Sequence, residues 1–227
     1  MDIEKNVKSF LEKVNRICDE SKRDPSEVVV VGASKSQDLT SIKSAYLSGI
    51  QHFGENFLQE AEIKIRSIDP PPCWHFIGSI QSRKAKKISS LFQWVHTLDR
   101  FKVAKLLNDH RPNYLGKLNV CVQVNPDNEV SKSGIRLEES EEFILSLKDL
   151  YMLNVRGLMA IPKYTEDNKQ QREVFAKIQI KFKELKKIFP HFDTLSMGMS
   201  EDYRSAIQEG ATMIRIGTNI FGKRNEK

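Results

Sequence analysis

Lys35 stands at the end of a short β-branched run, VVVVGASK, at residues 28–35. If that run is a buried strand, the lysine emerges beside apolar walls of low dielectric constant, and burial lowers the pKa of an ammonium group. The neutral amine that results is the species that attacks an aldehyde to form an imine. The pattern is compatible with a Schiff-base lysine, but on its own it favours the alternative, a solvent-facing lysine at a strand end.

A second group of chemically capable residues lies near the end of the sequence, in SMGMSEDYRSAIQEG (196–210) and RIGTNIFG (215–222). Ser200 stands where a helix N-cap, or the first residues of a helix, would present free N–H groups to a phosphate. Gly217 lets backbone approach a ligand closely, and the Thr218 hydroxyl can donate a hydrogen bond. The two acids after Ser200 also suit an ordinary helix start, which is the alternative interpretation.

Several other chemistries lack their motifs in this sequence. It contains no GxxxxGK[ST] loop, no GxSxG elbow and no HExxH pair, so neither a P-loop nucleotide site nor these two hydrolase classes is supported. The five histidines show no paired ligand spacing and the cysteines form no CxxC, and we therefore expect no metal site. The cysteines are few and far apart, which favours reduced thiols over a disulfide framework: Cys18, Cys73 and Cys121.

Short β-branched or aromatic runs alternate with longer amphipathic stretches along the chain. The runs predict eight strands, at residues 28–34, 50–56, 74–79, 93–99, 118–125, 154–161, 192–198 and 212–221. The stretches between them predict seven helices, at residues 41–49, 56–68, 82–92, 100–110, 137–150, 167–189 and 200–210, and a further helix near residues 2–22 precedes the first strand. Helical crossovers imply a parallel sheet. Eight such units favour a single α/β domain over residues 1–227, a TIM-type (β/α)8 barrel with an extra N-terminal helix, over an open doubly wound sheet.

In a barrel of this kind the carboxyl ends of the strands meet on one rim, where catalytic and binding residues gather. Lys35 follows the first predicted strand. Ser200, Gly217 and Thr218 fall in the loops after the seventh and eighth strands, which are the loops that commonly bind phosphate in such barrels. The sequence therefore predicts an amine and an anion site on the same rim.

Composition and charge exclude several classes of protein. The net charge is +6, from 36 basic and 30 acidic residues, but bases and acids are mixed along the helical stretches, which is typical of solvated helix faces rather than a nucleic-acid site. The first 22 residues include acids and no continuous apolar core, so they do not read as a signal peptide, and no run is long enough to span a membrane. We therefore expect a cytoplasmic protein that binds neither nucleic acid nor membrane.

The motifs themselves resemble those of a known family. VGASKSQ, FGENFLQEA, WHFIGSIQSRK, VHTLD, VQVN with SKSGI, GLMAI and LSMGMSEDYRSAIQEGATMIRIGTNIFG look like the motifs of the pyridoxal phosphate homeostasis proteins, which bind pyridoxal 5′-phosphate (PLP) and are related to the N-terminal barrel of alanine racemase. The resemblance implies that Lys35 forms the Schiff base and that the phosphate is held by Ser200, Gly217 and Thr218, with the backbone N–H of Met199 assisting. It also implies that Arg215 faces the pyridine nitrogen, that Asn56 lies near the ring substituents, and that His75 lies close to the ring.

Two functions fit this resemblance. The first is a PLP-binding homeostasis protein without strong catalytic activity, acting as a monomer that holds the cofactor and transiently meets apo PLP-dependent enzymes. The second is a PLP-dependent enzyme that acts on amino acids, such as a racemase. A racemase needs a base on each face of its substrate; Lys35 can serve one face, and the sequence offers no strong candidate for the other. An arginine beside the ring nitrogen would also oppose its protonation and weaken the ring as an electron sink. Racemases tolerate an arginine there, so this feature narrows the range of PLP chemistry without excluding racemisation. The lack of a candidate for the second base favours the binding function.

Overall fold

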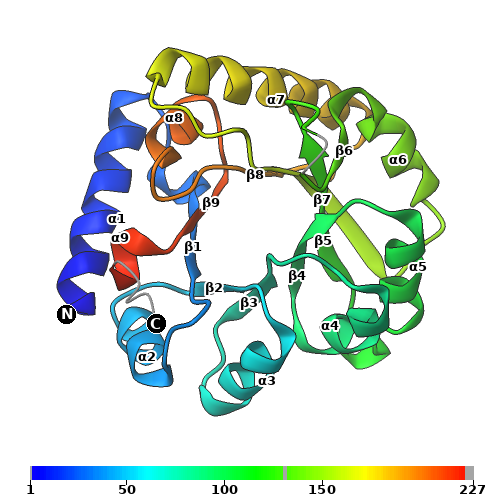
Figure 1. Cartoon of the computed structure of the whole chain (residues 1–227), viewed down its shortest axis with the longest axis horizontal. Coiled ribbons are helices and arrows are strands. Elements are labelled where there is room, and N and C mark those ends of the chain that lie inside the picture. Colours follow the sequence, from blue (N-terminus) through cyan, green and yellow to red (C-terminus); the bar gives the residue numbers. More distant parts are fainter. Residues whose placement is uncertain (1, 130–131, 223–227) are drawn as a thin grey trace.

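Eight parallel strands close into a barrel in the computed structural model, which describes residues 2–129 and 132–222 (Figure 1). They are paired in the order β4-β3-β2-β1-β9-β8-β7-β5, and a further pairing of β4 with β5 closes the ring. A two-residue strand, β6 (Ile135–Arg136), pairs with the end of β5. The barrel strands are β1 (Val29–Ala33), β2 (His52–Glu55), β3 (Cys73–Phe76), β4 (Trp94–Leu98), β5 (Leu118–Asn125), β7 (Leu153–Ala160), β8 (Thr194–Ser196) and β9 (Met213–Ile216).

Helices cover the outside of the barrel, as the alternating pattern predicts. They are α1 (Ile3–Glu20), α2 (Leu39–Leu47), α3 (Leu58–Ser67), α4 (Ala85–Leu91), α5 (Phe101–Asp109), α6 (Ser140–Ser146), α7 (Asn168–Ile188), α8 (Tyr203–Gln208) and α9 (Thr218–Phe221). The fold class and the extra N-terminal helix are thereby confirmed.

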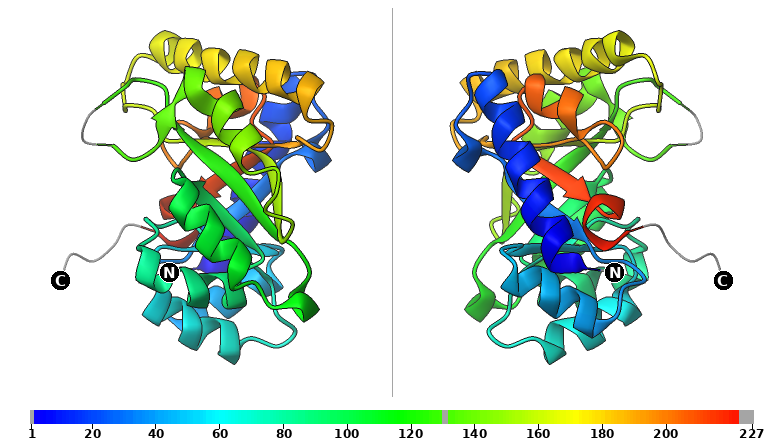
Figure 2. Two further views of the ribbon diagram at one scale, coloured as in Figure 1. Left: turned by 90° about the vertical axis from the view of Figure 1, so that its right-hand side faces the viewer. Right: turned by 90° about the vertical axis from the view of Figure 1, so that its left-hand side faces the viewer.

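Helix α1 runs along the outside of the barrel beside α8 and α9 (Figure 2). The N-cap residue of α1 is Asp2, whose side chain accepts a hydrogen bond of 2.9 Å from the backbone N–H of Lys5. Its buried residues recur at helical spacing, which gives α1 one apolar face against the barrel: Val7, Phe10, Val14, Ile17 and Cys18.

Two apolar clusters form on the two sides of the strands, because successive side chains of a strand point to opposite faces. The larger cluster fills the layer between the strands and the helices. The smaller one is built around Val31, Trp94, Cys121, Met159 and Met213. Charged and polar side chains from the same strands are buried as well, and they form a connected group described below.

The eighth strand is shorter in the structure than the sequence pattern predicts, and a helical turn takes the place of its second half. The run at residues 212–221 was predicted as strand throughout, but β9 ends at Ile216 and a helical turn, α9, follows. The carbonyl of Gly217 accepts hydrogen bonds from the N–H groups of Ile220 (3.0 Å) and Phe221 (2.8 Å), which turns the chain. Both side chains are buried. A run this short has no periodicity that separates strand from helix.

Among the described residues, no helix is both long and apolar enough to cross a bilayer. Helix α7 has 21 residues, but lysines alternate with its buried positions along the whole length.

Candidate functional site

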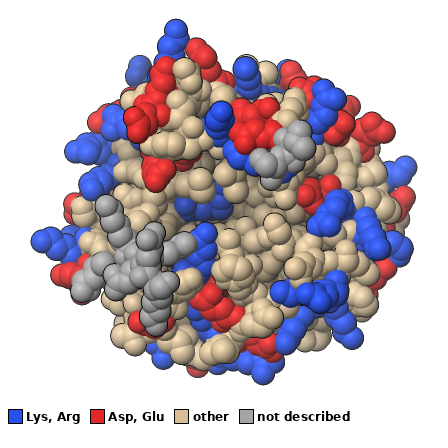
Figure 3. Space-filling model, viewed as in Figure 1, with Lys and Arg blue, Asp and Glu red and all other residues tan. Residues whose placement is uncertain are grey.

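A cavity of about 420 Å³ opens at the carboxyl ends of the strands. The face seen in Figure 3 is hollowed at its centre, and basic side chains lie at the bottom of the hollow. Seven of the eight site residues predicted from the sequence line the cavity: Lys35, Asn56, Met199, Ser200, Arg215, Gly217 and Thr218. Further lining residues, which the sequence analysis did not identify, are Ala33, Gln37, Ile77, Ile161, Glu201 and Gly222. The predicted amine and the predicted anion site therefore belong to one cavity.

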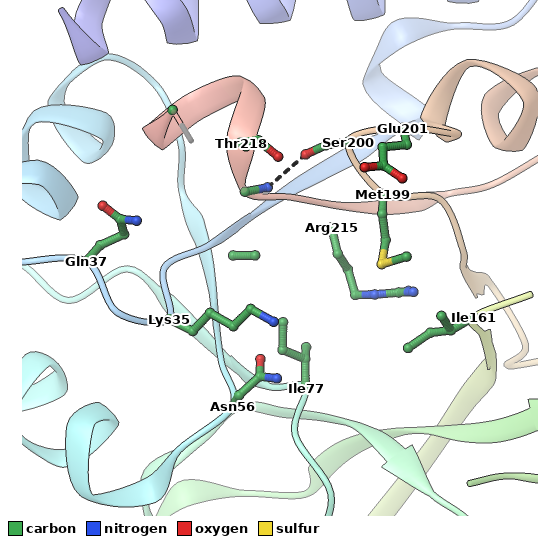
Figure 4. Close-up of a pocket in the computed structure, with 13 residues that line it drawn as sticks. Lys35, Gln37, Asn56, Ile77, Ile161, Met199, Ser200, Glu201, Arg215 and Thr218 are labelled. Carbon is green, nitrogen blue, oxygen red and sulfur yellow. Dashed lines mark hydrogen bonds between the residues drawn. The ribbon is translucent and has the colours of Figure 1, made fainter. Parts of the chain in front are cut away.

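Lys35 lies in the turn that follows β1, and its side chain runs into the cavity toward Asn56 and Ile77 (Figure 4). The turn needs an unusual backbone, since Ser36 has a φ of 62°. The N–H of Ser36 donates a hydrogen bond of 2.6 Å to Oε1 of Glu60. The turn that presents the lysine is thus held by a carboxylate from α3.

A buried ionic group lies directly behind this turn. Nζ of Lys64 donates to the carbonyl of Ser34 (2.7 Å) and to carboxylate oxygens of Glu55 (2.8 Å) and Glu60 (2.5 Å). The Ser34 hydroxyl donates to the same oxygen of Glu55 at 2.6 Å. Burial raises the pKa of Glu55, while the Lys64 ammonium acts in the opposite direction. Lys64 sits on the inner side of α3 at a spacing of four from Glu60, the one sequence signal that could have identified it.

The loop after β8 forms one side of the anion site. The Met199 carbonyl accepts the N–H groups of Asp202 (3.1 Å) and Tyr203 (2.8 Å), so a helical turn begins at Met199, ahead of α8. Oδ1 of Asp202 accepts a hydrogen bond of 2.6 Å from the N–H of Met199. In a capping box the side chain three residues after the N-cap accepts the N–H of the N-cap in the same way. The N–H of Met199, which the family resemblance assigned to the phosphate, donates to a carboxylate in the structure. The N–H groups of Ser200 and Glu201 donate to no described residue.

The start of α9 forms the other side. Its first residue, Thr218, is exposed and lines the cavity beside Ser200 (Figure 4). Oγ of Ser200 accepts a hydrogen bond of 3.3 Å from the N–H of Gly217, which joins the two loops. Two hydroxyls and the beginnings of two helical turns therefore converge on one point, an arrangement that suits an anion.

Arg215 is buried and extends from β9 into the cavity (Figure 4). Its Nη1 donates to Oγ of Ser196 at 2.7 Å, and its Nη2 donates to the carbonyl of Ala160 at 3.0 Å. Burial lowers the pKa of Arg215 to about 10. The guanidinium is therefore still cationic at neutral pH, and its orientation is fixed by two acceptors.

His75 is the predicted site residue that does not line the cavity. It lies inside the barrel in a file of hydrogen bonds: its Nε2 is 2.9 Å from Nδ1 of His52, and its Nδ1 is 2.8 Å from Nε2 of His96. Nδ1 of His96 in turn lies 2.9 Å from Oγ of Ser196, the hydroxyl that accepts from Arg215. Burial lowers the pKa values of His75 and His96 well below their usual range, so both rings are neutral. His75 thus connects to the cavity through three intermediates instead of facing it.

Asn56 follows β2 and provides an independent sign that the cavity receives a polar ligand. Its Oδ1 is buried and accepts no hydrogen bond from the part of the chain that the structure describes. A buried amide oxygen without a donor is costly. Gly78 allows this placement, since a Cβ there would lie 2.2 Å from the carbonyl oxygen of Asn56.

Comparison with known proteins identifies a family that covers nearly the whole chain. Residues 6–225 match the family model of the alanine racemase N-terminal domain. The pyridoxal phosphate homeostasis protein of Escherichia coli K12 is 41% identical over 228 residues, which cover 99% of this chain and 97% of that protein. The corresponding protein of Haemophilus influenzae is 42% identical over 230 residues, covering 99% of this chain and 97% of that protein.

Solved structures share the fold. PipY of Synechococcus elongatus PCC7942, solved with PLP bound, is 31% identical with a TM-score of 0.79, and the match covers 92% of this chain and 99% of that one. An alanine racemase of Clostridium difficile has a TM-score of 0.74 at 13% identity, with 98% of this chain and 61% of that chain covered, and so shares the fold alone. On its full-length relatives and its family model, this chain belongs to the pyridoxal phosphate homeostasis protein family, whose barrel is that of the alanine racemase N-terminal domain.

Proposed function

We propose that this protein binds PLP reversibly as a Schiff base on Lys35 and takes part in intracellular vitamin B6 homeostasis without strong catalytic activity. The observation that supports this most directly is the single cavity lined by Lys35, by Arg215 and by the hydroxyls of Ser200 and Thr218. Relatives that match nearly the whole chain are named for PLP homeostasis, and PipY was solved with PLP bound.

The chain's own residues would divide the cofactor between them. The phosphate would take the hydroxyls of Ser200 and Thr218, which converge at the end of the cavity away from Lys35 (Figure 4). The N–H of Gly217 donates to Oγ of Ser200 in the structure and would join the phosphate only on leaving that hydroxyl. Asn56 would meet the ring substituents, and Arg215 would face the pyridine nitrogen. The N–H of Met199 would join the phosphate only if Asp202 released it.

One feature narrows the chemistry that bound PLP could support, and a second favours holding the cofactor over turnover. PLP supplies an electron sink for carbanion chemistry, and a cation beside the ring nitrogen opposes the protonation that strengthens this sink. A second catalytic base would have to come from the cavity wall. Glu201 is the one carboxylate among the described residues that line the cavity, and it lies beside Ser200 at the end proposed for the phosphate (Figure 4). No described residue that lines the cavity is therefore placed to act as the second base that racemisation would need.

The test is to load the protein with PLP and incubate it in deuterated water with L-alanine or D-alanine. Proton NMR follows exchange at the α-carbon, and chiral chromatography follows inversion. We expect neither above the rate of free PLP, and we expect the bound PLP to activate an added apo PLP-dependent enzyme. Turnover well above that of free PLP would replace this proposal with the racemase-like alternative.

We propose a cytoplasmic monomer that meets its apo-enzyme recipients only transiently. Sedimentation of the PLP-loaded protein measures its oligomeric state, and a stable dimer would contradict the proposed monomer.

A further inference from the structure

Two strands bring three potential metal ligands together at the end of the barrel opposite the cavity. His52 and Cys73 are the first residues of β2 and β3 and are register partners, and His75 stands two residues beyond Cys73. Residues two apart on a strand share a face, so these side chains point the same way. One ligand atom from each lies within 4.8 Å of the others. Sequence spacing hid this cluster, because one member comes from a different strand.

The three donors suit a borderline-soft cation. Imidazole nitrogen and cysteine sulfur are the usual ligands of Zn²⁺, which binds nitrogen at about 2.0–2.1 Å and sulfur at about 2.3 Å. In a tetrahedral site two nitrogens then lie about 3.4 Å apart, so the 2.9 Å between Nδ1 of His52 and Nε2 of His75 needs to widen by only about half an ångström.

The surroundings of His75 are those of an oriented metal ligand. Its other ring nitrogen, Nδ1, is hydrogen-bonded to His96 at 2.8 Å, and a ligating histidine usually has such a partner. Its ring stacks on Trp94 with centroids 5.6 Å apart and planes within 11° of each other. The ring is therefore fixed both in its plane and in its rotation.

The file of hydrogen bonds tolerates ligation. An ion on Nε2 of His75 places the ring proton on Nδ1, which then donates to Nε2 of His96. Nδ1 of His96 donates to Oγ of Ser196, and this oxygen accepts from Arg215 as well, which its two lone pairs allow.

Access and charge also allow an ion to bind. His52 and Cys73 are half-buried, so solvent reaches them from the base of the barrel. Arg156 lies over the Trp94 ring on which His75 stacks. Its Nε donates to Oδ1 of Asp193 at 2.8 Å, so this carboxylate compensates the charge of the guanidinium.

We propose that His52, Cys73 and His75 form a binding site for a divalent cation of the Zn²⁺ type at the base of the barrel, with water as the fourth ligand. Binding forms a bond from the metal to each nitrogen and to sulfur. The Cys73 thiol loses its proton to solvent as the metal–sulfur bond forms, and the hydrogen bond between the two imidazoles breaks.

The experiment titrates Zn²⁺ into the full chain, without PLP and with a non-thiol reductant, in competition with a chromophoric chelator. We expect one ion per chain. Cys73→Ser and His52→Gln should each weaken binding by about 100-fold, because each removes one of the few protein ligands. Cys18→Ser and His191→Gln are the matched controls: a buried cysteine outside the cluster and an exposed histidine, both expected to bind as the parent does.

Co²⁺ provides the second measurement on the unaltered chain. A thiolate ligand gives Co²⁺ a charge-transfer absorption in the near ultraviolet, and we expect this band in the parent protein and not in Cys73→Ser. The proposal is overturned if the parent binds no Zn²⁺ saturably, if the His52→Gln/Cys73→Ser double variant binds as tightly as the parent, or if the parent shows no thiolate band. None of these readouts involves the cavity at the other end of the barrel, so failure here leaves the proposed function standing.

Discussion

At the residue scale, the cavity combines groups of two kinds. Arg215 is held in place by Ser196 and Ala160 before any ligand arrives. Ser200 and Thr218 offer hydroxyls whose bonds within the protein are few: a 3.3 Å bond from Gly217 to Ser200 joins their two loops. A cation of fixed orientation and available hydroxyls in one cavity together favour an anionic ligand.

The first prediction concerns these hydroxyls. Ser200→Ala and Thr218→Val should each weaken PLP retention by about 1–2 kcal/mol, since each removes one hydrogen bond to a charged group. Equilibrium dialysis with absorbance detection measures the change, and Ser90→Ala serves as control, since Ser90 is a half-buried serine on α4 that does not line the cavity. Unchanged PLP occupancy in the Ser200→Ala/Thr218→Val double variant would show that the phosphate does not bind at this end of the cavity.

Sequence alone predicts the residues that meet at the rim but not their hydrogen bonds. Lys35, Ser200 and Thr218 could be predicted because strand ends and loop positions follow from the alternating pattern. The N–H of Met199 was assigned to a ligand, yet it donates to Asp202, a competition that only the geometry of the turn reveals. His75 was placed next to the cofactor, but it lies behind Arg215 in the barrel.

At the element scale, α3 positions the loop after β1. Its Glu60 holds the N–H of Ser36, and its Lys64 reaches the carbonyl of Ser34 and the carboxylate of Glu55. The loop after β1, the end of β2 and α3 are thereby fixed together beside Lys35. The strand bounds could be predicted where a run ends at polar residues, as β5 does at Asn125, but not where an apolar turn follows, as it does after β9.

The second prediction breaks this ionic group. Lys64→Met should lower the free energy of unfolding by about 3–5 kcal/mol, because it leaves the buried Glu55 carboxylate without its cation. Adding Glu55→Gln should recover part of the loss, since no unpaired charge then remains. Urea unfolding followed by circular dichroism provides the measurement, with Lys43→Met on α2 as the control. If Lys64→Met alone is as stable as the parent, α3 does not secure the loop after β1 through this contact.

At the scale of the whole molecule, the barrel is joined from bottom to rim by one file of polar side chains. His52, His75, His96, Ser196 and Arg215 come from five different strands. The sequence could not predict this file, because hydrogen bonds between strands depend on register and closure, which no local pattern specifies. The apolar layer outside the strands, in contrast, follows from helical and strand periodicity.

The third prediction concerns that outer layer. Phe10 on α1 is 2% exposed and packs against Tyr203 with ring centroids 5.0 Å apart. Phe10→Ala should therefore cost about 3–5 kcal/mol of unfolding free energy. Glu12→Ala, on the exposed face of the same helix, should change it little. Equal midpoints in urea for Phe10→Ala and Glu12→Ala would show that α1 is not part of the cooperative barrel.

The most direct test of the whole account is the site of covalent attachment. The purified protein is mixed with PLP, its absorbance is recorded, the imine is reduced with borohydride, and the modified peptide is identified by mass spectrometry. We predict an imine absorbance and one reduced adduct per chain, on Lys35, and we predict that Lys35→Ala loses both while it keeps its circular dichroism spectrum. An adduct on a different lysine, with Lys35 unmodified, would contradict the account.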